Sequence, residues 1–147
     1  MEKSKKEEIK SVIANAANVF VASVDENGYP NIKAMFARMQ EGACHYMSTN
    51  YSSRRTRQFL KNSKCSIYYC DEKAYKGVMF LGHIEVCTDH DAKALLWEDR
   101  DTIYYPQGVD DPDYCVYRFV AERGNYYHGL QNMDFDISEL EESTSEG

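Results

Sequence analysis

The chain has 147 residues, a formal net charge of −7 at pH 7 and a pI of about 5.1. This length suits one domain with a hydrophobic core, and the acidic balance argues against general binding to nucleic acids or anionic membranes, which requires a broad basic surface. No apolar run approaches the ~20 residues of a membrane-spanning helix, and the charged N-terminus lacks the apolar segment of a signal peptide. We therefore expect a cytoplasmic protein.

The N-terminal half predicts one helix and three strands joined by short turns. Ser4 and Glu7 have the spacing of a capping box, and apolar residues recur on one face up to Ala16, which favours a helix. Residues 25–28 (Asp-Glu-Asn-Gly) are a hairpin signal, and residues 41–42 (Glu-Gly) mark a second turn. Strands are expected at residues 19–24, 29–39 and 43–48, followed by a short helix over residues 53–61.

The C-terminal half predicts three more strands and a third helix. Asp89 can cap a helix that runs to about Asp101, with Ala92, Leu95 and Leu96 facing inward. Prolines and a glycine between residues 102 and 113 indicate a loop. Strands are expected at residues 64–70, 75–88 and 114–121, and residues 125–128 could extend the sheet.

These elements amount to about six antiparallel strands and three helices, without the strand–helix alternation of a parallel sheet. Closing such a sheet into a small barrel removes its edges. We therefore expect a mainly β fold with peripheral helices, as a single domain over residues 1–130. Residues 131–147 are acidic and poor in apolar side chains, so a disordered tail is expected there.

Five cysteines are present, and no Cys-x-x-Cys motif occurs. Their odd number and their places in strand-like runs favour reduced, semi-buried thiols, as in the cytosol. The four histidines show no metal-ligand spacing with them. We expect no metal site. The cysteines are Cys44, Cys65, Cys70, Cys87 and Cys115.

Residues 48–58 (Ser-Thr-Asn-Tyr-Ser-Ser-Arg-Arg-Thr-Arg-Gln) are the strongest indication of a ligand site. Arg54 and Arg55 would lie in the first turn of a helix, where the macrodipole is already positive. A phosphate held by backbone N–H groups, hydroxyls and arginines would relieve this conflict. The alternative, which the residues alone leave open, is a solvated helix whose arginines pair with nearby acidic side chains.

This arginine segment and the order of the elements resemble the pyridoxamine 5′-phosphate oxidase-like family of flavin-binding split barrels. The resemblance covers about residues 19–120. It is sharpest at Thr49-Asn50, Ser53-Arg54-Arg55 and Gln58, where the oxidases have Thr-Asn, Ser-Arg-Lys and Gln at the same spacing. It implies a six-stranded antiparallel split β-barrel. It also implies a homodimer with two flavin mononucleotide (FMN) sites at the subunit interface.

The resemblance further implies which residues hold FMN. Arg54 and Arg55 stand where the family has the arginine–lysine pair that clamps the FMN phosphate. Arginine and lysine are not equivalent in bidentate phosphate binding, so individual contacts can differ. The other implied contacts are Lys33, Ala34, Met35, Phe36, Arg38, Ser48, Thr49, Ser53 and, through its backbone, Gly77.

Two departures from the oxidase pattern bear on activity. Gly77 stands where the oxidases have a glutamine that contacts the flavin. The chain also shows no counterpart of the C-terminal segment that completes the vitamin pocket. It therefore looks more like the short members of the family called general stress proteins. We expect a flavoprotein that acts as an oxidoreductase or flavin reductase on a small molecule of unknown identity, rather than as a pyridoxamine-phosphate oxidase.

The alternative from another class is a non-catalytic flavin or haem carrier or sensor. His45, His83 and His128 are candidate axial ligands or proton donors, but nothing in the sequence singles one out. A deazaflavin cofactor ranks lower, because no second basic cluster is present for its longer tail. Residues 102–113, which include Tyr104 and Tyr105, are expected to form the edge of a pocket.

Overall fold

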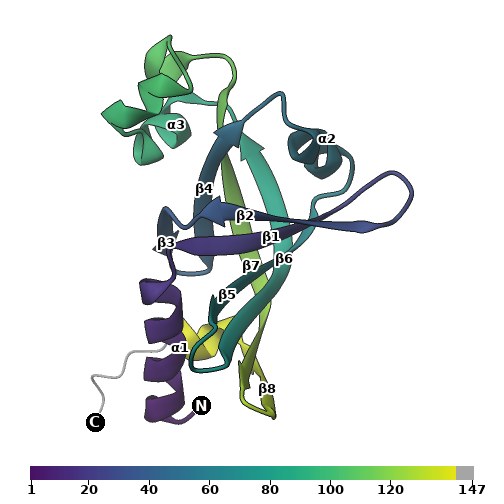
Figure 1. Ribbon diagram of the computed structural model, residues 1–147, viewed down its shortest axis with the longest axis vertical. Coiled ribbons are helices and arrows are strands. Elements are labelled where there is room, and N and C mark those ends of the chain that lie inside the picture. The colour runs from purple at the N-terminus through teal and green to yellow at the C-terminus, as the bar shows by residue number, and fades with distance from the viewer. Residues whose placement is uncertain (142–147) are drawn as a thin grey trace.

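The computed structural model describes residues 1–141, and one curled antiparallel sheet forms its centre (Figure 1). The strands are β1 (Asn18–Val24), β2 (Pro30–Phe36), β3 (Met39–Glu41), β4 (Cys44–Asn50), β5 (Lys64–Asp71), β6 (Lys76–Cys87), β7 (Tyr114–His128) and β8 (Gln131–Asp136). They are joined in the order β2-β1-β5-β6-β7-β4-β3, and β8 also pairs with β7. The expected mainly β, barrel-like fold is confirmed, with β3 and β8 as strands that the sequence did not predict.

The long strands β6 and β7 account for the curl of the sheet. Their register shifts between Leu81 and Gly82, and such a bulge bends and twists a strand pair. β7 pairs with β6 on one side along its length, but its neighbour on the other side changes at this bend. Its first half pairs with β4, and its second half pairs with β8. The two expected strands at residues 114–121 and 125–128 are therefore one continuous strand that serves both ends of the half-barrel.

The main core lies inside the curl, and helix α1 (Lys3–Asn15) covers one end of it (Figure 1). Ile9, Val12 and Ile13 of α1 are buried against the core, as their spacing on one helical face predicts. Helix α2 (Arg54–Lys61) lies toward the other end and inserts Phe59 into the same core. Within residues 1–141, no helix is long and apolar enough to span a membrane.

A smaller layer covers the start of β7. It consists of helix α3 (His90–Leu96) and the 3₁₀ turns η1 (Asp99–Ile103) and η2 (Gly108–Asp110). The expected cap is present, because the Asp89 carboxylate accepts the N–H of Ala92 at 3.1 Å. The expected helix to Asp101 is wrong, since α3 ends at Leu96. Leu95 is 49% exposed rather than inward. Lys93 is buried in its place, because its ammonium donates to the carbonyl of Asp111 at 2.9 Å.

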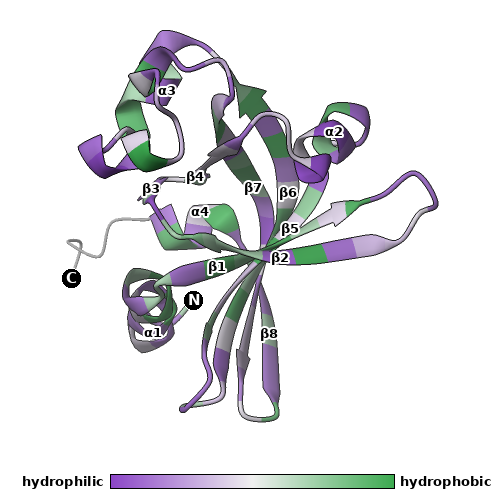
Figure 2. Cartoon of the chain, turned by 45° about the horizontal axis from the view of Figure 1, so that its top comes forward, coloured by the Kyte–Doolittle hydropathy of each residue, from purple (hydrophilic) through white to green (hydrophobic). Residues whose placement is uncertain are grey.

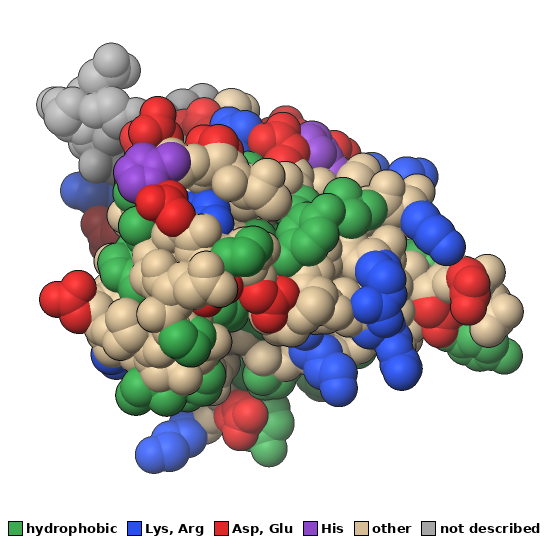
Figure 3. Space-filling view, turned by 90° about the horizontal axis from the view of Figure 1, so that it is seen from above, with side chains coloured by type: hydrophobic (Ala, Val, Ile, Leu, Met, Phe, Trp, Pro, Cys, Tyr) green, Lys and Arg blue, Asp and Glu red, His purple; other side chains and the backbone are tan. Residues whose placement is uncertain are grey.

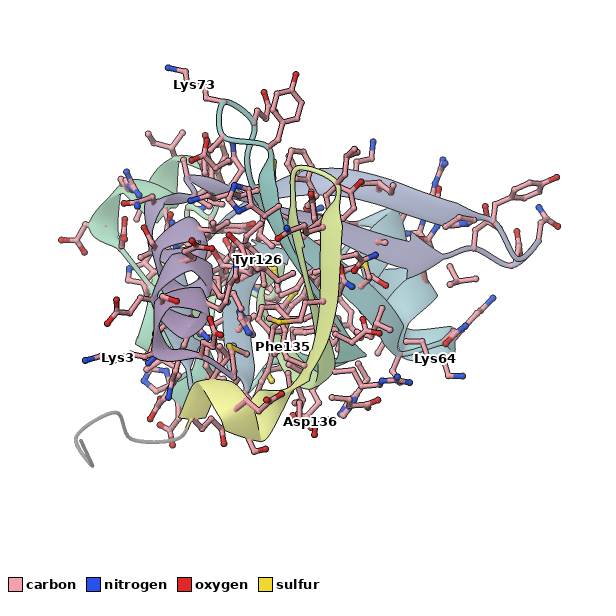
Figure 4. The ribbon with its side chains drawn as sticks, turned by 90° about the horizontal axis from the view of Figure 1, so that it is seen from below. Lys3, Lys64, Lys73, Tyr126, Phe135 and Asp136 are labelled. Carbon is pink, nitrogen blue, oxygen red and sulfur yellow. The ribbon has the colours of Figure 1, made fainter. Side chains whose placement is uncertain are left out.

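The expected disorder from residue 131 onward is wrong for residues 131–141. They form β8 and helix α4 (Ile137–Glu141), which lies near α1 (Figure 4). Phe135 is 5% exposed, and its ring meets that of Phe80 edge-on at 6.0 Å. Gly124 leaves the space for it, since a Cβ there would lie 2.3 Å from the Phe135 ring. Residues 142–147 of the expected tail lie outside the described residues.

Candidate functional site

The turn from β4 into α2 is held by hydrogen bonds on both sides. Ser53 is the N-cap of α2, and its Oγ accepts the N–H of Thr56 at 3.1 Å. Asp113, just before β7, accepts the N–H of Ser52 at 2.8 Å through its carboxylate. The first turn of α2 contains no acidic residue. The positive end of this helix is therefore left without an acidic side chain from its own first turn.

Arg55 has one polar group without a partner. Its Nη2 donates to Thr49 Oγ1 at 2.9 Å, and its guanidinium carbon lies 5.9 Å from the centroid of the Tyr117 ring. Its Nε is buried and makes no hydrogen bond, and no other buried side-chain nitrogen or oxygen in residues 1–141 shares this condition. A buried unsatisfied donor costs about 1–3 kcal/mol, and more when it is charged. An anion at this point would satisfy Nε.

The arginines of α2 are not paired with acids. Within the described residues, Arg54, Arg55 and Arg57 form no ion pair with a carboxylate. Arg57 instead donates to the carbonyl of Ser52 at 3.0 Å. Of the two interpretations that the sequence left open, surface ion pairing is thus not observed.

Arg54 and Arg55 point to different places, because adjacent helical positions differ by about 100°. Arg54 is exposed and lines a cavity of about 710 Å³ between α2 and the β1–β2 hairpin, together with Arg57 and Lys61. Lysine and arginine side chains gather on this side of the molecule (Figure 3). Arg55 thus reaches Thr49, whereas Arg54 lines this cavity.

The β2 segment lies at the free edge of the sheet. β2 pairs with β1 on one side and approaches β4 on the other without pairing. Lys33, Ala34 and Phe36 are exposed, whereas Met35 is buried in the core. An unpaired strand edge offers backbone N–H and C=O groups to a ligand or a partner. Ser48 and Thr49, on β4, are half-buried and buried respectively.

Arg38 is engaged elsewhere. Its Nη2 donates to the carbonyl of Leu96 at 2.8 Å and to the Asp101 carboxylate at 3.1 Å. This contact ties the chain between β2 and β3 to the η1 layer. The expected continuous strand over residues 29–39 spans only Pro30–Phe36. Arg38 is not brought together with Arg55.

Gly77 lies far from Arg55 along the sheet. It pairs with Tyr127 near the end of β7, whereas Thr49 pairs with Cys115 near the start of that strand. A Cβ at Gly77 would lie 1.8 Å from the hydroxyl of Tyr68, so Tyr68 occupies the space of any side chain there.

The histidines considered as ligands or proton donors are separated from this site. His45 is 1% exposed in the main core, with Nδ1 2.7 Å from the Tyr69 hydroxyl, and burial lowers the pKa of His45 to about 4. His83 Nδ1 lies 2.9 Å from Glu122. His128 lies 4.0 Å from Glu8. None of the three contacts the arginine segment.

Sequence reasoning assigned no individual role to three residues of the site. Asp113, Thr56 and Tyr117 all hydrogen-bond to the turn before α2 or to its cap. Thr56 had a local signal, because it stands at the third helical position after the Ser53 cap. Asp113 and Tyr117 had none, since they reach this turn from more than sixty positions away.

The chain is similar to proteins of one family. The family model described as pyridoxamine 5′-phosphate oxidase matches residues 6–128. Over 89 residues the chain is 26% identical to the pyridoxine/pyridoxamine 5′-phosphate oxidase of Agrobacterium fabrum, an alignment that spans 60% of this chain and 43% of that enzyme. The chain thus matches less than half of the length of this curated relative.

Two solved structures extend the comparison. One is a Clostridium acetobutylicum protein related to general stress protein 26 of Bacillus subtilis and described as of the pyridoxinephosphate oxidase family. It is 40% identical, with a TM-score of 0.86, and the match covers 95% of this chain and 99% of that chain. The other is a haem-binding protein from Mycobacterium smegmatis, 16% identical with a TM-score of 0.75, covering 95% of this chain and 61% of that chain. At this low identity, the second match shows a shared fold alone.

Proposed function

The chain belongs to the pyridoxamine 5′-phosphate oxidase family, and on this premise we propose that it binds FMN with the phosphate at Arg55. The observation that carries the proposal is the buried Arg55 Nε without a hydrogen-bond partner. A phosphate oxygen is the acceptor that this donor lacks, and charge-assisted bonds of this kind are among the strongest in proteins. The Ser53-capped N-terminus of α2 adds backbone N–H groups and a favourable dipole.

The exposed edge of β2 is the proposed contact for the flavin ring. Lys33, Ala34 and Phe36 present an exposed strand edge, which suits a flat ring laid along the backbone. Bound FMN would supply hydride transfer at its ring, and the protein would supply binding and orientation. We assign no proton donor, because His45 is enclosed in the core. The proposed activity is that of an FMN-dependent oxidoreductase or flavin reductase, with the substrate unassigned.

We also propose that the protein works as a homodimer. The outer face of the sheet carries apolar side chains that no helix of residues 1–141 covers. The strand register places five of them on one side: Ile32 and Phe36 of β2, Tyr68 of β5, Leu81 of β6 and Tyr127 of β7. Hydrophobic residues on β2, at the sheet edge, are also visible in Figure 2. Large exposed apolar patches mark interaction sites, and a second copy would bury this one.

A dimer would also reconcile the separate positions of the expected FMN contacts. Gly77 and Arg55 lie toward opposite ends of the half-barrel, so one subunit does not bring them together. A pocket that includes both would combine residues of two subunits. This reasoning supports a shared site at the interface.

The test combines cofactor retention with apparent mass. The protein is mixed with FMN, desalted and examined by absorption spectroscopy and gel filtration, alongside Arg55→Gln and the matched control Arg57→Gln. We expect about one FMN per subunit on a dimer for the wild type and for Arg57→Gln, whose guanidinium is exposed and donates to the Ser52 carbonyl. We expect no retained FMN for Arg55→Gln.

Two results would contradict the proposal. One is a wild-type protein that retains no FMN, or that carries the strong Soret band of haem instead. The other is an Arg55→Gln variant that retains as much FMN as the control. A wild type that retains FMN but reduces no acceptor would support the non-catalytic alternative.

A further inference from the structure

We propose that Tyr117 of β7 is a positioning residue that sets the orientation of Arg55 toward a phosphate. This inference rests on the proposed FMN site and adds a residue from a strand that supplied no expected contact. Tyr117 is fully buried and lies beneath the first turn of α2, with one contact through its hydroxyl and another through its ring.

The hydroxyl contact is to the cap of α2. Tyr117 Oη lies 2.5 Å from Thr56 Oγ1 and 3.4 Å from Ser53 Oγ. Thr56 is itself fully buried, and its Oγ1 also lies 2.9 Å from Ser53 Oγ and donates to the carbonyl of Asn50 at 3.3 Å. The Tyr117 hydroxyl therefore contacts both the N-cap side chain of α2, Ser53, and the side chain that bonds to it, Thr56.

The ring contact is to Arg55 itself. The guanidinium lies over the Tyr117 ring, with its carbon 5.9 Å from the centroid. Phe59, one turn further along α2, meets the same ring edge-on at 5.3 Å and limits its rotation. Arg55 is thus held between the ring face and Thr49 Oγ1, which leaves Nε as the free donor. A cation within about 6 Å of a ring centroid is attracted to the ring face, more so when water is excluded.

The other buried tyrosines have hydrogen-bond partners of a different kind from those of Tyr117. Tyr69 bonds to His45, Tyr114 donates to the carbonyl of Lys93, and Tyr126 donates to Glu8. Each of these partners lies outside the arginine segment. Within residues 1–141, the Tyr117 hydroxyl is bonded only to Ser53 and Thr56, both of which are in this segment. Burial also raises the pKa of Tyr117, so the group stays a neutral hydroxyl at neutral pH.

The test separates phosphate positioning from general stability by comparing two ligands. Dissociation constants for FMN and for riboflavin, which has the same ring and no phosphate, are measured by flavin fluorescence for the wild type and Tyr117→Phe. We expect the wild type to prefer FMN. We expect Tyr117→Phe to reduce this preference about fivefold to tenfold, the effect of losing one well-placed hydrogen bond, while riboflavin affinity changes little.

Two further variants complete the design. Thr56→Val removes the other end of the same hydrogen bond and should reduce the preference by a similar factor, which keeps the test usable if Tyr117→Phe fails to fold. Tyr69→Phe is the matched control. It removes a buried tyrosine hydroxyl whose partner is His45 in the core, so it should leave the preference unchanged.

The outcomes are distinguishable. A wild type without any preference for FMN would overturn the proposed phosphate site. A wild-type preference that survives both Tyr117→Phe and Thr56→Val would overturn only the role of the Tyr117 hydroxyl in positioning Arg55. Equal weakening of FMN and riboflavin in Tyr117→Phe would show that Tyr117 supports the fold and does not position Arg55.

Discussion

Acidification should destabilise the protein through His45, which the fold encloses in its main core. The side chain is 1% exposed, bonded to the Tyr69 hydroxyl and in contact with the rings of Phe80 and Phe119. Burial lowers the pKa of His45 from 6.5 to about 4. The unfolded chain therefore takes up this proton first as the pH falls. Stability due to neutral His45 is fully present above pH 6.5 and is lost between 6.5 and about 4.

The size of the loss follows from the difference between the two pKa values. At about 1.4 kcal/mol per pH unit, acidification from 6.5 to about 4 removes roughly 3 kcal/mol of unfolding free energy through this one group. That is a large part of the ~5–15 kcal/mol by which domains are stable.

Urea unfolding of the wild type and of His45→Gln, from pH 7.5 to pH 4.5, isolates this contribution. The variant keeps a polar side chain near Tyr69 but cannot take up the proton. It should be less stable than the wild type at pH 7.5, and the difference should shrink by about 2 kcal/mol or more at pH 4.5. The contributions of the other titrating groups to the unfolding free energy are the same in both proteins, so they cancel in the difference. A difference that stays constant with pH would refute the reasoning, as would an NMR signal of His45 that titrates near pH 6.5 in the folded protein.

Two further substitutions test packing and assembly. Phe135→Ala should lower the unfolding free energy by about 3–5 kcal/mol, because it removes a buried ring that packs on Phe80. Chemical denaturation measures this loss, and a change below about 1 kcal/mol would mean that β8 contributes little to the fold. Phe36→Asp should convert the proposed homodimer into monomers. Phe36 is 70% exposed on the uncovered sheet face, so a carboxylate there would be buried in the apolar interface of the dimer. Sedimentation velocity measures this, and an unchanged dimer would assign the interface to another surface.

Local signals in the sequence were enough for most of the fold. The Asp89 cap accepts the N–H of Ala92 as predicted, and α2 begins at Arg54, one residue after its expected start. The expected Ser4–Glu7 capping box is absent, because α1 begins at Lys3 with Glu2 at its N-cap. The hairpin at residues 25–28 joins β1 and β2 as expected. These features depend on side chains a few positions apart, and such spacing can be read directly from the chain.

The missed features depend on contacts between distant residues. β8 has one buried aromatic side chain, Phe135, among mostly polar neighbours, and it pairs with the second half of the long strand β7. The second strand ends at Phe36, and Arg38 beyond it bonds to Asp101, 63 positions away. Tyr117 meets Thr56 across 61 positions. No local periodicity encodes these encounters.

The same distinction applies to the candidate site. The arginine segment and its place at the start of α2 could be predicted from the sequence, because the residue types and the helix boundary are local. The unpaired Nε of Arg55 could not, since it depends on how α2 packs against the half-barrel.

The most direct test of the central proposal is a crystal structure of the protein grown with FMN. The proposal predicts that this structure will show a phosphate oxygen within about 3 Å of Arg55 Nε. Arg55 should still be bonded to Thr49 and lie over the Tyr117 ring. A structure with FMN bound elsewhere, for example between α2 and the β1–β2 hairpin, and with Arg55 Nε still unpartnered, would contradict it.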